Sequence, residues 1–327
     1  MNIEDILNIT QGELVNSPSI QAVQSATAYP SKVELGDLFF ASRREDIPLA
    51  VKNEAYSIVF EGSTPQIEDE EIAWIRVDSI KRASFKLLRY VQLKKGAKFF
   101  WLSPHQISFL KMILKYRGDV EILSEDWVRA FETILNGNSE LFVGSDYELI
   151  SSVEPNFAKI DSSKDGQIIR DTLFKTTFKV DSFIYQEREL SPIHFDYLLE
   201  TITFLENLKF EYSLDRIKYT KHFVPIFVDK NLTKLPNGKS DKVIIFCDNT
   251  DDIKMAREYI RRENRWLKSI VLTPPKVKVE DLKRAEWFKS KSEAREILKS
   301  KDFNYAFVYG VGKEILETKD GKNLTLI

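Results

Sequence analysis

The sequence predicts an α/β protein with more than one domain, and three observations support this class. Short apolar segments, typical of buried strands, alternate with segments whose apolar residues recur every three to four positions, as in helices that face a core. Turn-forming glycine and proline residues separate many of these segments. The chain has 327 residues, of which 43% are hydrophobic and 30% charged, a composition typical of folded proteins and long enough for two or three domains.

The first predicted domain covers residues 1–95 and is a compact α/β unit. A turn at Gly36 leads into a buried strand, and Lys94-Lys95-Gly96 ends the last helix of the unit. The expected elements are a helix over 2–8, a strand within 33–41, a helix over 46–55, strands over 56–60 and 72–77, and a helix over 79–92.

The second predicted domain covers residues 96–238. Ser103 and Pro104 follow a strand and favour a helix start, because serine caps free N–H groups and proline fits the first helical position. The polar stretch 161–167 indicates an exposed loop. The expected elements are a strand over 98–102, a helix over 105–116, a strand over 121–123, a helix over 125–135, a strand over 140–143, a hairpin within 172–190 and a helix over 193–207.

The third predicted domain covers residues 239–327, after a turn at Pro236-Asn237-Gly238. Its strands are separated by helices, a pattern that favours a Rossmann-like parallel sheet. The expected elements are a strand over 242–247, a helix over 251–263, a strand over 269–273, helices over 280–286 and 291–300, and a strand over 305–309.

Charge, hydropathy and cysteine content exclude several classes of partner. The 48 Lys and Arg residues nearly balance the 50 Asp and Glu residues, so the net charge of −2 provides no general attraction to nucleic acid or to anionic lipid. The N-terminus lacks a secretory signal, and no apolar run approaches the roughly 18–20 residues that span a bilayer. A single cysteine, Cys247, excludes an internal disulfide and fits a reducing compartment. We therefore expect a cytoplasmic protein with no nucleic-acid partner and no membrane partner.

The chain lacks a glycine loop of the kind that binds nucleotide phosphates. Such a loop places glycines between a strand and a helix, where backbone N–H groups close on the phosphate oxygens. Gly238-Lys239-Ser240 precedes a strand instead of a helix, and Gly310-Val311-Gly312 has Ile315 where the third glycine of a dinucleotide motif would stand. We interpret both fragments as turns and expect no cofactor.

A polar run follows the strand over 242–247. It extends from Asp248 to Asp252 and opens a helix at the carboxyl end of the strand, where polar side chains either cap N–H groups or bind a ligand. Capping is the commoner role of such residues, because every helix start has free N–H groups. Both interpretations remain open at this point.

The chain has three histidines, His105, His194 and His222, which lie far apart in the sequence. None of them has the spacing of a zinc motif, so we expect no metal. His194 opens an apolar helix, where packing or capping is more common than a role as general base. We assign no catalytic residue, and Cys247, at the end of a buried strand, is interpreted as a core residue.

Several segments carry motif-like sequences in a fixed order. They are 9–14 (ITQGEL), 36–41 (GDLFFA), 54–59 (EAYSIV), 190–195 (LSPIHF), 247–256 (CDNTDDIKMA) and 305–310 (YAFVYG). In this order they resemble motifs of the Mur ligases of peptidoglycan synthesis, closest to the MurF type, which joins D-alanyl-D-alanine to the UDP-muramoyl tripeptide. The resemblance implies a three-part architecture and makes His194, Asp248, Asn249 and Asp251 the candidate ligand-binding residues.

The chain departs from this family at the phosphate loop. Where the family has TGSSGKT, this sequence has Ser103, Pro104, His105 and Gln106, without glycine or lysine. Pro104 lacks an N–H donor, and neither His105 nor Gln106 supplies a fixed positive charge. The family's TDSR motif is replaced by Ala28-Tyr29-Pro30-Ser31, and the central region is short for a complete ATPase domain.

Two functional hypotheses follow from this resemblance. The first is a bacterial pseudoenzyme: a Mur-ligase-like protein without ATP-dependent ligase activity that binds a cell-wall precursor or Mur enzymes, as a binding or scaffolding module. The second is a divergent enzyme that joins or modifies a UDP-muramoyl-peptide-like substrate with a rebuilt site around His105, His194, Asp248 and Asn249. The second hypothesis requires these four side chains to converge.

Overall fold

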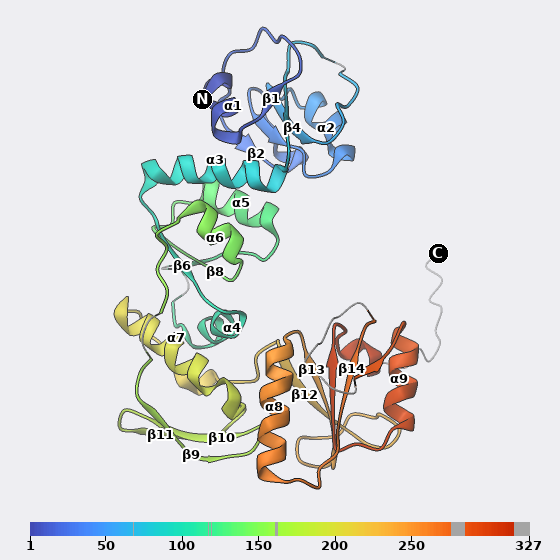
Figure 1. Ribbon diagram of the computed structural model, residues 1–327. Helices are drawn as coiled ribbons and strands as arrows, with labels where there is room; N and C mark the ends of the chain where they lie inside the picture. The colour runs from blue at the N-terminus through green and yellow to red at the C-terminus, as the bar shows by residue number, and fades with distance from the viewer. Residues whose placement is uncertain (68, 117, 119, 161–162, 276–284, 317–327) are drawn as a thin grey trace, which may run out of the picture. The chain divides into compact units, whose positions relative to one another are not determined.

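The computed structural model describes residues 1–67, 69–116, 118, 120–160, 163–275 and 285–316. The chain divides into two compact units (Figure 1). Unit 1 contains Met1–Ser103 and Tyr116–Asp161, and unit 2 contains Pro104–Lys115 and Ser162–Ile327. The three-domain division into 1–95, 96–238 and 239–327 stays a prediction, because spatial contacts do not establish which segments fold independently.

Unit 1 contains a five-stranded sheet in the order β1-β5-β4-β3-β2. Strands β2 to β5 are parallel and β1 is antiparallel to β5. Nearly every side chain of β3, β4 and β5 is buried, which explains why these strands read as continuous apolar runs. The elements are α1 (Ile3–Thr10), β1 (Glu13–Leu14), β2 (Ala26–Thr27), β3 (Leu38–Phe40), α2 (Ile47–Lys52), β4 (Ser57–Glu61) and β5 (Ala73–Val77).

The second sheet of unit 1 has three parallel strands, in the order β6-β8-β7. Helix α3 connects the two sheets; it begins at an N-cap, Ser79, and ends at Gly96 with a left-handed φ of 69°. One apolar core joins residues from both sheets, from Ile3 to Val153. The elements are α3 (Ile80–Lys95), β6 (Lys98–Trp101), β7 (Glu121–Ile122), α5 (Trp127–Asn136), β8 (Leu141–Gly144) and α6 (Tyr147–Val153).

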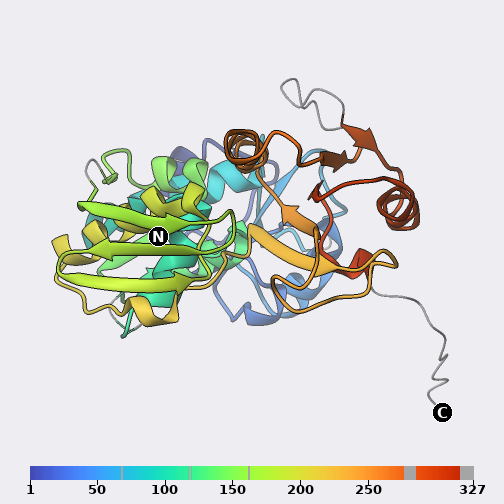
Figure 2. The same ribbon diagram turned by 90° about the horizontal axis from the view of Figure 1, so that it is seen from below.

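Unit 2 begins with α4 (Pro104–Ile113), which packs against α7 (Phe195–Asn207). The expected hairpin within 172–190 is confirmed as β10 (Thr176–Val180) and β11 (Phe183–Arg188). A third antiparallel strand, β9 (Gly166–Asp171), pairs with β10, and Figure 2 shows the three strands side by side. β9 was not expected from the sequence, because most of its side chains are exposed and it therefore has no apolar run.

The last sheet of unit 2 has the order β12-β13-β16-β14-β15. Strands β13 to β16 are parallel, as expected, and β12 is antiparallel to β13. β12 lies before the predicted boundary at residue 238 and still belongs to this sheet. The strands are β12 (Phe223–Val228), β13 (Lys242–Cys247), β14 (Ser269–Thr273), β15 (Glu286–Trp287) and β16 (Tyr305–Tyr309).

Two helices cover the two faces of this sheet. Val243 and Ile245 of β13 pack in one core with α8 (Thr250–Glu263), whereas Ile244 packs in another core with α9 (Lys291–Ser300). This alternation of buried side chains gives the Rossmann-like layering that the sequence predicts. The helix expected over 280–286 lies outside the described residues except for its last two positions, 285 and 286, and Glu286 belongs to β15.

The two glycine fragments form turns. Gly238 and Gly310 have φ of 77° and 78°, in the left-handed region that favours glycine. At Gly310 a Cβ atom would also lie 3.1 Å from Pro274 Cγ. Within the part of the chain that the structure describes, no helix has both the length and the apolar character needed to cross a bilayer.

Candidate functional site

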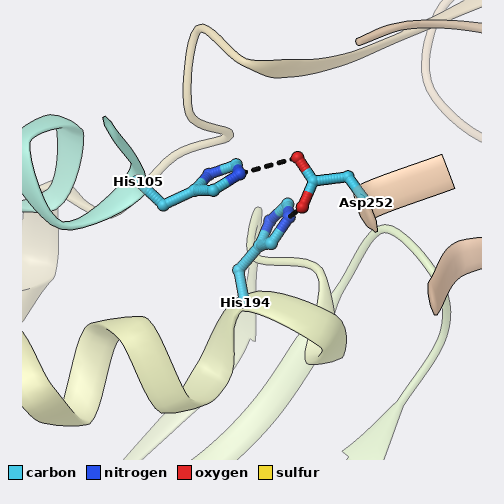
Figure 3. A group of neighbouring side chains, drawn as sticks. All are labelled: His105, His194 and Asp252. Carbon is cyan, nitrogen blue, oxygen red and sulfur yellow. Dashed lines mark hydrogen bonds and ion pairs between the residues drawn. The ribbon is translucent and has the colours of Figure 1, made fainter. Parts of the chain in front are cut away.

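All three histidines of the chain lie close together in unit 2. Those at positions 105 and 194 contact the carboxylate of Asp252 (Figure 3). His105 is the second residue of α4, and His194 ends the short helix Pro192–His194 that leads into α7. His222 directly precedes β12. Asp252 lies in the first turn of α8, on the same side of the helix as the buried Ala256.

The two histidines that contact Asp252 bind different oxygens of its carboxylate. His105 Nε2 lies 2.7 Å from Oδ2, and His194 Nε2 lies 3.3 Å from Oδ1. The two imidazole rings stack, with centroids 4.0 Å apart and planes at 29°. All three residues are at most 2% exposed, so this charge and its partners are removed from bulk water.

The buried carboxylate is ionised because the histidines compensate for its burial. Burial by itself raises the pKa of Asp252, but the hydrogen bonds and the charge interaction with His105 and His194 outweigh it and lower the pKa to about 2. Burial lowers the pKa of His194 below its ordinary value, although the bond to Asp252 acts in the opposite direction. At neutral pH the cluster therefore contains a carboxylate beside a neutral His194.

Further contacts hold the rings of His105 and His194 in place. His105 Nδ1 lies 2.9 Å from the Oγ1 atom of Thr220, which is buried. Tyr197 stacks on His105 with ring centroids 5.2 Å apart, and Phe223 meets His194 edge-on at 5.0 Å. Each ring is thus held from several sides, a rigidity that a binding or catalytic group requires.

The third histidine forms a second pair beside the first. His222 Nδ1 contacts Asp248 Oδ2, and the His222 ring lies edge-on to His105 with centroids 5.5 Å apart. The Nε2 atom of His222 is buried and has no hydrogen-bond partner among the described residues. An Nδ1 atom that donates to Asp248 leaves a lone pair on this Nε2.

The candidate ligand-binding residues of the polar run have three different environments. Asn249 caps α8 by accepting a hydrogen bond from the N–H of Asp251 at 2.9 Å. Asp251 has a 70% exposed side chain and lies 3.4 Å from Lys254. Asp248 joins the histidine cluster through His222. Cys247 is buried, and its pKa is raised by burial and then by Asp252 and Asp248, so it is a neutral thiol.

The residues at the position of the family's phosphate loop are used for packing. His105 and Gln106 are 2% and 6% exposed, and both turn their side chains into unit 2. Gln106 Nε2 donates to Glu200 Oε2 at 2.7 Å. Pro104 is the first residue of α4, as the sequence predicts, and Ser103 is the last residue of its segment of unit 1.

Asp252 belongs to the polar run but was not among the named candidate ligand-binding residues, and His222 and Thr220 were not assigned to a site. One signal for Asp252 was available, because it stands beside Ile253 and four residues before Ala256, on the apolar side of its helix. His222 and Thr220 offered no comparable signal.

The ligand atoms of His105, His194 and Asp252 all lie within 4.8 Å of one another, so these residues could hold a metal ion. The expectation that no metal binds rested on sequence spacing. Sequence spacing does not register residues that the fold brings together, so the expectation stays a prediction.

Two cavities lie at the sheets. In unit 1 a cavity of about 550 Å³ lies at the carboxyl ends of β3 and β4 and is lined by Ser42, Arg44 and Asp78, among other residues. In unit 2 a cavity of about 380 Å³ lies at the amino ends of β13 and β16 and is lined by Phe174, Tyr219 and other residues. Ligands of parallel sheets bind mostly at carboxyl ends, which favours the first cavity and the region of Asp248 and Asp252.

Comparison with solved structures shows a Mur-ligase-like fold. MurF from Acinetobacter baumannii aligns with a TM-score of 0.51 and 11% identity, over 94% of this chain and 95% of that chain. MurF ligase from Thermotoga maritima, solved in complex with ADP, aligns with a TM-score of 0.52 and 10% identity, over 90% of this chain and 95% of that chain. No family model matches this sequence, and no curated protein matches it. At this identity the likeness establishes the architecture and not the activity.

Proposed function

We propose that this chain is a bacterial, cytoplasmic Mur-ligase-like protein that lacks ATP-dependent ligase activity and binds a peptidoglycan precursor or a Mur enzyme. The observation that carries this proposal is the start of α4. There the side chains of His105 and Gln106 are buried and hydrogen-bonded inside unit 2, where a phosphate-binding loop would need accessible N–H groups and a lysine.

Burial of these side chains opposes phosphate binding in a specific way. His105 is held by Asp252 and Thr220, so its ring is not available to a nucleotide. Glu200, the partner of Gln106, adds a carboxyl group to this region, and burial raises the pKa of that group. An ATP phosphate would meet a proline and a carboxyl group instead of N–H donors and a cation.

The cavity of unit 1 supports the binding part of the proposal. It lies at the carboxyl ends of parallel strands, and Arg44 brings a guanidinium group to it. Arginine is well suited to phosphate recognition because its planar fork donates paired hydrogen bonds. A nucleotide-linked precursor carries a diphosphate with which this guanidinium would pair, beside the carboxylates of Glu61 and Asp78 that also line the cavity.

The test is a thermal-shift and hydrolysis experiment on the full chain. UDP-MurNAc or one of its peptides raises the melting temperature by mass action, whereas ATP does not, and no ATP hydrolysis is detected with both present. Ser63→Trp, at an exposed position that lines the cavity, abolishes the shift, and Ser182→Trp, an exposed position in unit 2, retains it. ATP hydrolysis that depends on a UDP-muramoyl peptide would falsify the absence of ligase activity.

A second candidate is a divergent enzyme that joins or modifies a UDP-muramoyl-peptide-like substrate. It is favoured by the convergence of His105 and His194 on Asp252, with Asp248 connected through His222. Asn249, by contrast, serves as a helix cap. Mass spectrometry of the substrate after incubation with the wild type and with His194→Gln tests this candidate, and it is abandoned if the wild type leaves the substrate mass unchanged.

A further inference from the structure

We infer that His105, His194 and Asp252 form a binding site for a divalent transition-metal ion of the zinc class. Three elements of unit 2 contribute one residue each: α4, the short helix before α7, and the first turn of α8. Their ligand atoms lie within 4.8 Å of one another in a fully buried setting. This inference is independent of whether the chain binds a cell-wall precursor.

At one of the two histidine–carboxylate contacts, that of His194 with Asp252, the distance between the two ligand atoms is better suited to a bound ion than to a hydrogen bond. Two atoms that are each about 2.0–2.1 Å from a tetrahedral zinc ion are about 3.3–3.4 Å apart. His194 Nε2 and Asp252 Oδ1 are 3.3 Å apart, longer than the usual range of about 2.7–3.2 Å for an N–H···O hydrogen bond. The contact of His105 Nε2 with Asp252, at 2.7 Å, must widen when an ion enters.

The outer contacts have the form found around metal-binding histidines. Such a histidine has its second ring nitrogen held by an oxygen, which fixes the tautomer and the ring orientation. Among the proposed ligands, Thr220 Oγ1 holds Nδ1 of His105 in this way. The neighbouring His222, which is not one of the three ligands, has a similar contact between its Nδ1 and Asp248. In both rings Nε2 is the nitrogen left for another partner, and in His222 that atom is buried and unpartnered among the described residues.

The donor set selects the class of ion. Two imidazoles and one carboxylate suit zinc and neighbouring transition metals, whereas magnesium and calcium prefer oxygen ligands throughout. The buried thiol of Cys247 does not belong to this group of converging ligand atoms, so the described residues add no soft sulfur ligand to it. Three protein ligands leave a fourth position for water or substrate, as in catalytic zinc sites.

A chain of side chains leads from this site toward solvent. His222 lies edge-on to His105, and its partner Asp248 has a 59% exposed side chain. An ion can therefore first meet the exposed carboxylate and then the imidazoles.

The first test uses the wild-type full chain. After treatment with a chelator and its removal, addition of Zn²⁺ gives one tightly bound ion per chain by elemental analysis, Co²⁺ gives visible absorption bands of a four-coordinate site, and Mg²⁺ is not retained. Because the chain has only three histidines, NMR resolves all their imidazole signals, and Zn²⁺ changes the signals of at least two. Absence of stoichiometric Zn²⁺, or changes in fewer than two histidines, overturns the inference; this result requires no variant to fold.

The second test compares neighbouring carboxylates. Asp252→Asn lowers the Zn²⁺ affinity by more than the about 10–100-fold that loss of an outer contact costs, because it removes a ligand. Asp251→Asn, the matched control in the same helical turn with a 70% exposed side chain, leaves the affinity unchanged. Equal Zn²⁺ affinity in the two variants excludes Asp252 as a ligand and overturns the site as drawn.

Discussion

Two of the buried carboxylates, Glu132 in unit 1 and Asp252 in unit 2, show how the same physical problem is solved in different ways. Glu132 of α5 is 6% exposed, and its Oε1 accepts hydrogen bonds from Thr27 Oγ1 at 2.6 Å and from the N–H of Ala28 at 2.7 Å. Asp252 of α8 is fully buried and faces His105 and His194. In both residues the carboxylate oxygens have hydrogen-bond partners, as is usual for buried polar groups.

The partners differ in what else they can do. The other oxygen of Glu132 accepts from the amide of Asn136 at 3.2 Å and lies 3.8 Å from the exposed ammonium of Lys32. Hydroxyl, amide and ammonium groups ordinarily neither titrate near neutral pH nor bind a transition metal, so Glu132 serves to join α5 to the end of β2. Imidazoles do both. The contrast teaches that burial of a carboxylate does not by itself indicate a site, whereas burial against groups that change protonation or ligation does.

The largest effect is expected for Asp252→Ala. The substitution leaves two buried imidazoles without their acceptor, so the free energy of unfolding falls by about 3–5 kcal/mol. Chemical denaturation measures the change, and Asp251→Ala, at an exposed position, stays within about 0.5 kcal/mol of the wild type. A loss below about 1 kcal/mol for Asp252→Ala would mean that the cluster is not tightly coupled.

Glu132→Ala is expected to cost less, about 2–3 kcal/mol, because it leaves one hydroxyl and one N–H group unsatisfied in unit 1. Glu132→Gln keeps an acceptor for both donors and costs under about 1 kcal/mol. If Glu132→Gln destabilises the protein as much as Asp252→Asn does, the negative charge is equally important at both positions. The distinction between a structural carboxylate in unit 1 and a site-forming carboxylate in unit 2 would then be wrong.

The pH dependence of stability should come from unit 2. The pKa of Asp252 is lowered from 3.8 to about 2, so its stabilisation, about 2 kcal/mol, is complete above pH about 4 and is lost as the pH falls toward 2. The pKa of His194 is lowered from 6.5, so its contribution is complete above pH 6.5 and is lost as the pH falls below that value.

Denaturation of the metal-free wild type should therefore show a free energy of unfolding that decreases steadily from pH 7 to pH 3. In His194→Gln the decrease that begins near pH 6.5 disappears, while the decrease below pH 4 remains in part. A wild-type profile that is flat between pH 7 and pH 5 speaks against a neutral, buried His194.

The smallest effect is expected for Thr220→Val. Valine has nearly the same shape but no hydroxyl, so His105 Nδ1 loses its partner and the free energy of unfolding falls by about 1 kcal/mol. Zn²⁺ affinity falls about 10–100-fold, because the ring is less well oriented. Thr201→Val, which removes a bond from Oγ1 to the carbonyl of Tyr197 inside α7, is the control with unchanged Zn²⁺ affinity. Equal Zn²⁺ affinity in both variants would show that Thr220 does not orient the His105 ring for metal binding.

Much of the fold was predictable because it depends on local patterns. The strand over 242–247 matches β13 residue for residue, and α8 begins within one residue of the expected start because Asn249 supplies a strong N-cap. β9 was missed because it is largely exposed. β12 was not among the expected strands. Its pairing with β13 also crosses the predicted domain boundary, and such pairing leaves no trace in a local pattern.

The sequence by itself determined the alternation of strands and helices, the turns at Gly238 and Gly310, and the absence of a glycine-rich phosphate loop, since each depends on neighbouring residues. Only the tertiary structure decided that the histidines form a cluster. His105 is 147 residues from Asp252 and His194 is 58 residues from it. No spacing rule reaches across such separations, because the packing of α4, α7 and α8 brings these side chains together, and that packing depends on the whole apolar core of unit 2.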